Sequence, residues 1–510
     1  MQVEFLGHAG ICIESGKTKV LMDGWFSREG GFDASWYQLP ANHHLGDSDW
    51  SKLDALIVSH EHLDHLDSQF LRKLPASIPL YVPSYGSSLF ARKLRRMTGR
   101  SPKVLSTGKE HQIGDLQLRI WTEASPMNQD SVWVFRQGGH SIVHTVDSRL
   151  NPDQLDEILN YLGREPDLLL VQCSGASWFP LVYENYDEAT KYARGMRKRE
   201  QKLLYALAVA NRLRPRTVVC CAGPPAFLDE SLRYANADPS FPTPGEACEW
   251  FKVKGYRGRI EGPLPGDRLD LASGELTQNR PMHDAFAWES TAAYIDGYAR
   301  RMQPYIAEVY RRADSLQVGD MNEAVTSHFT RMLTLNPYFN QRIDMTMCLD
   351  IEGPEGGVWL VDFRGSGSVR RGTLDDDCQY RYRFHSRWLK RILVDHVPWE
   401  DFLLSLRFHA YRDPDIYNDH LLGLLKFNDA ASLRVIEAYE KRETHENIVV
   451  ATDDGLRYEI ARYCPHAGAA LDKAPIDGHI LTCLNHHYRF DLDSGKCLDG
   501  NCSLRTKKLG

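Results

Sequence analysis

Short apolar runs separated by glycine and polar residues dominate the first 150 residues of the chain. Val3–Leu6, Gly10–Ile13 and Lys19–Met22 have the length and composition of short strands with turns between them. Leu53–Val58 is a mostly apolar run of the kind that forms a buried strand, and Ser141–Val146 is another. This part of the chain therefore predicts an α/β region rich in short strands.

The pattern changes twice further along the chain. Residues 280–345 place apolar side chains three and four positions apart, which predicts helices. From Met345 the period falls to two, as in half-buried strands, and helical spacing returns near Trp388. The sequence predicts three domains: 1–275 with an α/β fold, 276–435 with an α+β fold, and a β-rich domain over 436–510. The middle region resembles sterol-carrier-like modules; it could equally be a packing platform between its neighbours.

Composition narrows the classes of function. The chain has 510 residues and a formal net charge of −7, which argues against nucleic acid as a partner. No stretch approaches twenty apolar residues, so we expect no membrane span and no membrane partner. Eleven cysteines, an odd number at irregular positions, favour a reducing compartment over a disulfide framework. We expect a cytoplasmic protein.

The last domain carries a metal-binding motif of high specificity. Cys464 and His466 are followed, after sixteen residues, by Cys483 and His486. This spacing predicts a 2Fe–2S cluster with two thiolates on one iron and two imidazoles on the other. The segment resembles the Rieske domain of oxygenases and their ferredoxins, since Ala469 stands where quinol-oxidising Rieske proteins carry an extra cysteine. The alternative is a Cys2His2 zinc site.

A second candidate metal site follows the predicted strand Leu53–Val58. His60, His62, Asp64 and His65 lie within six residues, the H-x-H-x-D-H pattern of the metallo-β-lactamase fold. The first 270 residues resemble that superfamily, which implies an αββα sandwich. The resemblance also makes Asp147, at the end of the predicted strand Ser141–Val146, the metal-bridging aspartate. It further implies that Asp23 supports the metal-binding loop, and that His8 lies near the metal as a supporting residue.

The predicted site departs from the hydrolases of this fold. The stretch 123–131 lacks the usual third histidine, and either Asn128 or Asp130 could fill its place. The last histidine of the fold is missing as well. A site poor in imidazole and rich in carboxylate suits iron better than two zinc ions. Two histidines and one carboxylate, which His60, His62 and Asp147 could supply, form the arrangement with which non-haem iron binds O2. One or two irons are compatible with this motif, and zinc is the alternative.

The two metal sites together resemble the CMP-N-acetylneuraminate hydroxylase family. Further likeness lies in Ser174–Pro180, Arg197–Glu200 and Ala222–Phe227. That family joins a Rieske domain to the same fold and inserts one oxygen atom from O2, but its Rieske domain comes first in the chain. The resemblance implies a Rieske-coupled, non-haem iron-dependent monooxygenase that hydroxylates or N-oxygenates a small molecule. Because no G-x-G-x-x-G follows a strand, we expect a separate reductase or ferredoxin to supply electrons.

Two other functions fit the same residues. One is a zinc-dependent hydrolase of the metallo-β-lactamase fold whose Rieske domain is regulatory. The other is an electron-transfer protein in which the first domain is only a scaffold. The basic run Arg194–Glu200 could bind a phosphate group, although such a run is more often a solvated helix face.

Overall fold

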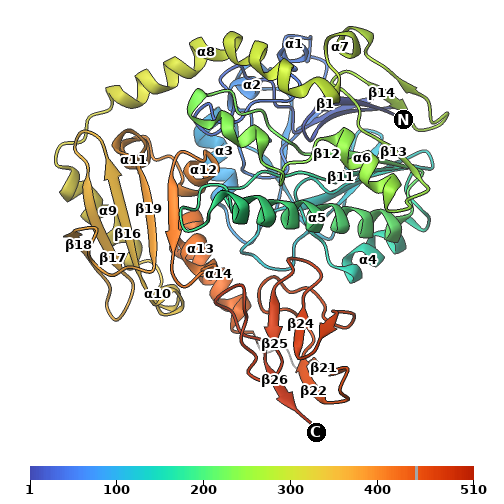
Figure 1. Ribbon diagram of the computed structural model, residues 1–510. Coiled ribbons are helices and arrows are strands. Elements are labelled where there is room, and N and C mark those ends of the chain that lie inside the picture. Colours follow the sequence, from blue (N-terminus) through green and yellow to red (C-terminus); the bar gives the residue numbers. More distant parts are fainter. Residues whose placement is uncertain (443–445, 510) are drawn as a thin grey trace. The chain divides into compact units, whose positions relative to one another are not determined.

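The structure is a computed structural model that describes residues 1–442 and 446–509. The chain forms two compact units. The first contains residues 1–123, 129–181 and 188–310, and the second contains 124–128, 182–187 and the chain from 311 onwards (Figure 1). The three-domain division drawn from the sequence stays a prediction, since its boundaries at 275 and 435 are not those of the two units.

Two β-sheets form the centre of the first unit. The eight-stranded sheet has the order β15-β14-β1-β2-β3-β4-β5-β6, and the seven-stranded sheet has the order β13-β12-β11-β10-β9-β8-β7. The strands of the first sheet are β1 (Gln2–Gly7), β2 (Gly10–Ser15), β3 (Thr18–Met22), β4 (Ala55–Ile57), β5 (Leu80–Pro83), β6 (Lys103–Leu105), β14 (Arg268–Asp270) and β15 (Leu276–Thr277). Those of the second are β7 (Glu110–Ile113), β8 (Leu116–Thr122), β9 (Ser131–Gln137), β10 (His140–His144), β11 (Leu168–Gln172), β12 (Thr217–Cys221) and β13 (Arg259–Glu261).

The register of these strands determines where a site can form. Strands β3 to β6 are parallel to one another, and so are β10 to β13. The carboxyl ends of neighbouring parallel strands lie at one edge of a sheet, so the loops that follow them gather there. The loops after β3, β4, β10 and β11 contain candidate metal ligands or residues that lie beside them.

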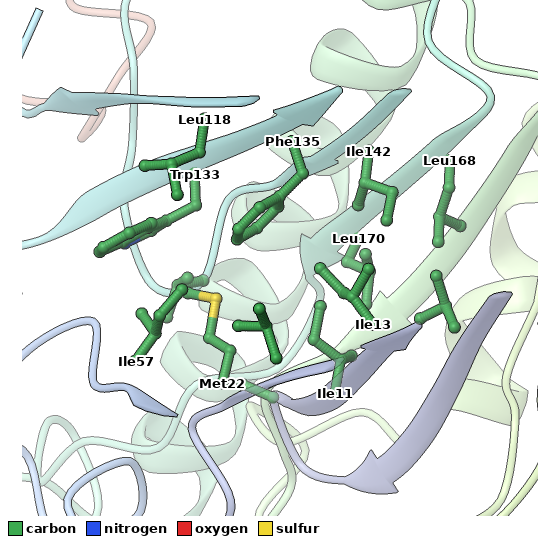
Figure 2. Packing of buried hydrophobic residues seen from close by; sticks show 14 of the residues in the cluster. Ile11, Ile13, Met22, Ile57, Leu118, Trp133, Phe135, Ile142, Leu168 and Leu170 are labelled. Carbon is green, nitrogen blue, oxygen red and sulfur yellow. The ribbon is translucent and has the colours of Figure 1, made fainter. Parts of the chain in front are cut away.

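A single apolar core fills the space between the two sheets. Alternate residues of each strand point inward, because successive side chains of a strand lie on opposite faces. Figure 2 shows Ile11, Ile13, Met22 and Ile57 of the first sheet packed against Leu118, Trp133, Phe135, Ile142, Leu168 and Leu170 of the second. All ten are at most 1% exposed. Burying a side chain of this size stabilises the fold by roughly 1.5–3 kcal/mol.

Helices cover the outer faces of both sheets. Phe70 of α2 (Ser68–Lys73) and Leu94 of α3 (Leu89–Thr98) pack on the outer face of the first sheet. The second sheet is covered by α4 (Pro152–Leu162), α5 (Glu188–Leu213) and α6 (Pro244–Val253), which contribute Ile158, Val209 and Phe251 to one apolar cluster. The αββα sandwich expected from the sequence is confirmed. The remaining helices of this unit are α1 (His43–Gly46), η1 (Glu230–Ala237), α7 (Arg280–Ala285), η2 (Trp288–Ser290) and α8 (Thr291–Ser315), the last of which runs past Tyr310 into the second unit.

The second unit contains a five-stranded sheet of order β18-β17-β16-β19-β20. Its strands are β16 (Thr346–Glu352), β17 (Gly357–Asp362), β18 (Ser368–Gly372), β19 (Tyr380–His385) and β20 (His409–Arg412). The accompanying helices are α9 (Met321–Leu333), α10 (Pro337–Ile343), α11 (Ser386–Leu393), α12 (Trp399–Leu404), α13 (Asp419–Phe427) and α14 (Ala430–Glu440). The α+β character predicted for the middle of the chain is therefore observed.

Two small antiparallel sheets form the end of the chain. Strands β21 (Asn447–Ala451), β22 (Arg457–Ala461) and β26 (Thr506–Lys508) pair in one sheet. Strands β23 (Ile476–Asp477), β24 (Ile480–Thr482) and β25 (Arg489–Asp491) pair in the other. Their shared core includes the fully buried Tyr458, Leu481 and Phe490. Within residues 1–442 and 446–509, no helix combines the length and the apolar character that crossing a membrane would require.

Candidate metal centres

The loop between β4 and α2 is held in place by a buried aspartate on the neighbouring strand. Asp23 follows β3 directly and accepts hydrogen bonds from the backbone N–H (2.8 Å) and the hydroxyl (2.5 Å) of Ser59. Its second oxygen also lies 2.9 Å from Nδ1 of His65. At the other end of the loop, Asp67 accepts a hydrogen bond from the Phe70 N–H and so caps α2. The loop therefore presents its polar side chains in a defined arrangement.

His60, His62 and Asp147 form one group of potential metal ligands. Each offers one donor atom, and these atoms all lie within 4.8 Å of one another. Nε2 of His60 is 3.0 Å from Nδ1 of His62 and 3.9 Å from Oδ2 of Asp147. His60 and His62 come from the loop after β4, whereas Asp147 comes from the loop after β10. Donor atoms from loops of both sheets therefore lie close enough together to bind one metal ion.

A second group lies beside the first and consists of His8, Asp64 and His65. Nε2 of His8 is 2.8 Å from Oδ2 of Asp64, and Nε2 of His65 is 3.6 Å from the same oxygen. His65 also lies 3.6 Å from Oδ1 of Asp147, so Asp147 faces both groups. The sequence assigned His8 a supporting role, and the structure places its ring among the potential ligands. In the sequence, the feature that could have indicated a ligand role for His8 was its place in the turn between Gly7 and Gly10, which joins the first two predicted strands.

Asp130, not Asn128, lies in the first unit beside the histidines. Oδ1 of Asp130 is 3.7 Å from Nε2 of His60. Asn128 belongs to the segment 124–128 of the second unit. A carboxylate therefore stands beside His60, in the stretch where the hydrolases of this fold carry a histidine.

The donor set fits a cation. Asp64 Oδ1, His65 Nε2 and Asp147 Oδ1 are buried and have no hydrogen-bond partner among the residues that the structure describes. Burial would raise the pKa of Asp64, but His65 and His8 hold it well below its usual value. Conversely, burial would lower the pKa of His65, yet Asp64 and Asp147 raise it. Carboxylates and imidazoles in one site suit non-haem iron.

The four predicted cluster ligands come from two loops in the second unit. Cys464 follows β22, and its N–H donates to the carbonyl of Ala469 across a tight loop (2.8 Å). Cys483 follows β24, and its N–H donates to the carbonyl of Tyr488 (2.9 Å). The two thiols are hydrogen-bonded to each other, which lowers the pKa of Cys483 to about 6 although burial acts against this. A lowered thiol pKa favours the thiolate, the form that binds metal.

The two histidines complete the donor set. The rings of His466 and His486 lie with centroids 4.8 Å apart. Nδ1 of His466 is buried without a hydrogen-bond partner among the described residues. Two sulfurs and two imidazoles thus meet between two loops, as a 2Fe–2S cluster with mixed ligands requires.

Asp419 and Tyr488 support the cluster histidine, and sequence reasoning did not identify them. Oδ1 of Asp419, the first residue of α13, lies 3.4 Å from Nε2 of His466. The Tyr488 ring stacks on His466 at 4.1 Å, and its hydroxyl donates to Asp419 (3.1 Å). Burial would lower the pKa of His466, but Asp419 raises it. Asp419 is 45 positions before Cys464 in the chain, and no local pattern marks it.

Two family descriptions match the chain. Residues 2–221 match the beta-lactamase superfamily domain, and residues 429–509 match the Rieske [2Fe-2S] domain. All four predicted cluster ligands lie inside the second match. The Rieske domain binds a 2Fe–2S cluster, as the motif predicted.

Relatives match over most or all of the chain. A Rieske 2Fe-2S iron-sulfur protein from Mycolicibacterium smegmatis is 30% identical over 100% of both chains. One from Mycobacterium tuberculosis is 29% identical over 98% of both. The cytidine monophosphate-N-acetylneuraminic acid hydroxylase of Macaca mulatta is 24% identical over 82% of this chain and 70% of its own. The chain therefore belongs to the family of Rieske 2Fe-2S iron-sulfur proteins that the two mycobacterial relatives represent.

Proposed function

We propose that the protein is a Rieske-coupled, non-haem iron-dependent monooxygenase acting on a small molecule. The observation that carries the proposal is the presence, in one chain, of a one-electron carrier and a second metal site rich in carboxylates. Asp64, Asp130 and Asp147 lie among the histidines of that second site. Hydrolysis at zinc consumes no electrons, so a zinc hydrolase would not use the electron that the cluster carries.

Iron held in the N-terminal site would supply the activation of O2. One oxygen atom would enter the substrate and the other would leave as water, which consumes two electrons and two protons from outside. The electrons would come from a separate reductase or ferredoxin and pass through the cluster one at a time. The hydroxylase name of the relative from Macaca mulatta supports this kind of reaction.

The chain's own residues would position the metal and shield it. His60, His62, Asp130 and Asp147 would hold one ion, and His8, Asp64, His65 and Asp147 would hold a second one. Asp23, which is 1% exposed, fixes the orientation of His65 through Nδ1 and leaves Nε2 for the metal. His60, Asp64 and His65 are at most 3% exposed and so are shielded from bulk water.

The origin of the oxygen atom tests the proposal. The iron-loaded protein would be incubated with a reductase–ferredoxin pair, oxygen-18 gas and a small-molecule extract, and the products compared by mass spectrometry with those of His62→Ala. The proposal predicts a product that carries one oxygen-18 atom and is absent with the variant. Label incorporated only from water, without need for a reductant, would instead identify a hydrolase.

A further inference from the structure

Two lysines of α5 meet the loop that follows β11. Lys202 donates to the carbonyl oxygens of Gly175 and Ser240, both at 2.7 Å. Lys198, one turn earlier, donates to the hydroxyl of Ser177 and to the carbonyl of Phe179 (2.9 Å). All four of these partners are uncharged. Neither ammonium group has a carboxylate within ion-pair distance among the residues that the structure describes.

A third cation stands beside the lysines. Arg149 packs over the ring of Tyr205, which is on the same helix as Lys198. Arg149 acts electrostatically on both lysines, and Lys198 acts on Lys202. The carboxylate of Glu123 accepts a hydrogen bond from the Arg149 N–H (2.6 Å) and also acts on the guanidinium, so Arg149 already has an anionic neighbour.

Burial makes this arrangement costly without a counter-charge. Lys202 is only 6% exposed. Burial, together with the neighbouring cations, lowers the pKa of Lys198 to about 8 and that of Lys202 well below its usual value. Asp238 opposes these effects on both lysines, but it is not in contact with either. A bound anion would stabilise the two ammonium groups.

The cationic site adjoins the N-terminal metal centre. Arg149 is two residues after Asp147, and Asp147 is one of the charges that act on Lys202. The hydroxyls of Ser148 and Ser174, next in sequence to Arg149 and Gly175, are buried and have no hydrogen-bond partner among the described residues. Lys198, Arg149 and the loop 175–179 are half-buried, so a solute can reach them.

From these contacts we infer that Lys198 and Lys202 bind a doubly charged oxyanion, a phosphate monoester group of the substrate, beside the metal centre. This inference rests on the proposed function and names its class of substrate. Lysine is a usual partner of phosphate, and two ammonium groups match a dianion better than a single carboxylate. Lys198 and Lys202 are four residues apart and share one helix face, whereas Arg197 lies on an exposed face of the same helix.

Binding of inorganic phosphate to the full-length, cluster-containing protein tests the inference without any need for turnover. We expect titration calorimetry to detect phosphate binding in preference to acetate. Lys198→Gln should weaken it roughly 10- to 100-fold, as expected for the loss of a charged hydrogen-bond donor. Lys198→Arg should retain most of the affinity. The matched control Arg197→Gln removes the same charge from the same helix and should bind like the wild type.

Two further measurements separate this site from the metal and from folding. His62→Ala should keep its phosphate affinity, so phosphate held by iron alone would be recognised by its loss in that variant. In the unmodified protein, phosphate should protect Lys198 from acetylation, while chloride at the same ionic strength should not. Equal affinity of Lys198→Gln and the wild type, or acetylation of Lys198 unaffected by phosphate, would overturn the inference. Either result would leave the proposed oxygenase reaction standing.

Discussion

The two metal sites of this protein are built in opposite ways. The four predicted ligands of the cluster come from two loops between residues 464 and 486 of one small β-domain. The candidate donors of the N-terminal centre come from four segments: His8 after β1, the loop after β4, Asp130 before β9 and Asp147 after β10. One is a local motif, and the other exists only when two sheets are packed together.

This difference extends to chemistry. Two thiolates and two imidazoles close the coordination of a cluster, which can then only gain or lose an electron. Carboxylates and imidazoles at the meeting point of two sheets leave positions open for small molecules. The comparison predicts that each site can be emptied without disturbing the other, because their ligands belong to separate compact units.

The largest effect is expected at the cluster. Cys464→Ser should abolish the visible absorption and the electron-spin signal of the cluster, since a thiolate ligand is lost and no other cysteine follows in the same loop. Cys378→Ser, a cysteine of the five-stranded-sheet region, should keep both signals. Metal analysis should find the N-terminal site still filled. Loss of metal from both sites in Cys464→Ser would contradict their independence.

His62→Ala is the reciprocal experiment. The half-buried His62 can be shortened without opening the core, and the variant should lose iron from the N-terminal site while its cluster spectrum stays unchanged. Glu61→Gln is the matched control, because Glu61 directly precedes His62 in the same loop and is outside both ligand groups. Iron counting together with cluster absorption checks both variants. An unchanged iron content in His62→Ala would show that the metal is bound elsewhere.

A smaller effect is expected from the residue that supports the loop. Asp23→Asn keeps the volume but weakens the hydrogen bonds to Ser59 and His65. Supporting residues of this kind contribute roughly 10- to 100-fold to metal affinity. Competition with a chelator would measure the loss. Asp54→Asn, which alters a carboxylate that accepts from the Lys19 N–H on the same sheet, should leave metal affinity unchanged.

The anion site should respond to pH. The pKa of Lys198, lowered to about 8 by burial, should rise when phosphate binds, because the anion favours the charged ammonium. Affinity for the phosphate dianion should therefore fall as the pH rises from about 8 through the pKa of the bound state. Lys202, Arg149 and Asp238 surround Lys198, and Lys202 should contribute in the same direction. A phosphate affinity that stays constant up to pH 10 would contradict this assignment.

The smallest expected effect concerns the tuning of the cluster. Asp419→Asn removes a negative charge 3.4 Å from the His466 ring and should raise the reduction potential by tens of millivolts, since the reduced cluster carries one more negative charge. Asp472→Asn, in an ion pair with Arg462 on the same domain, is the control and should leave the potential nearly unchanged. A redox titration followed by absorption measures both. A lower potential in Asp419→Asn would contradict the electrostatic argument.

The same contrast explains what the sequence could predict. Cys464, His466, Cys483 and His486 could be predicted as ligands from spacing alone, and so could the loop His60–His65, because each set occupies a short stretch with its own signature. His8 was given only a supporting role, and the choice between Asn128 and Asp130 stayed open. Both depend on how the two sheets pack, which no local pattern records. Asp419 escaped notice for the same reason.

The apolar pattern predicted the architecture better than it predicted the contacts. The apolar runs predicted an α/β region rich in short strands, while the resemblance to the metallo-β-lactamase superfamily implied that its layers form an αββα sandwich. The basic run Arg194–Glu200 shows that a sequence pattern does not predict which residues of a helix make contacts. Its interpretation as a solvated face holds for Arg197, which is exposed, but Lys198 turns toward the loop after β11.

An anaerobic reductive titration tests most directly whether the N-terminal centre is redox-active iron. Iron-loaded wild-type protein would be titrated with a reductant of known strength, and the electrons taken up would be counted beside the cluster spectrum. The account predicts that the wild type takes up more electrons than its cluster alone can hold, that His62→Ala takes up only one, and that O2 withdraws the additional electrons. Uptake of a single electron by both proteins, with zinc in the N-terminal site, would contradict it.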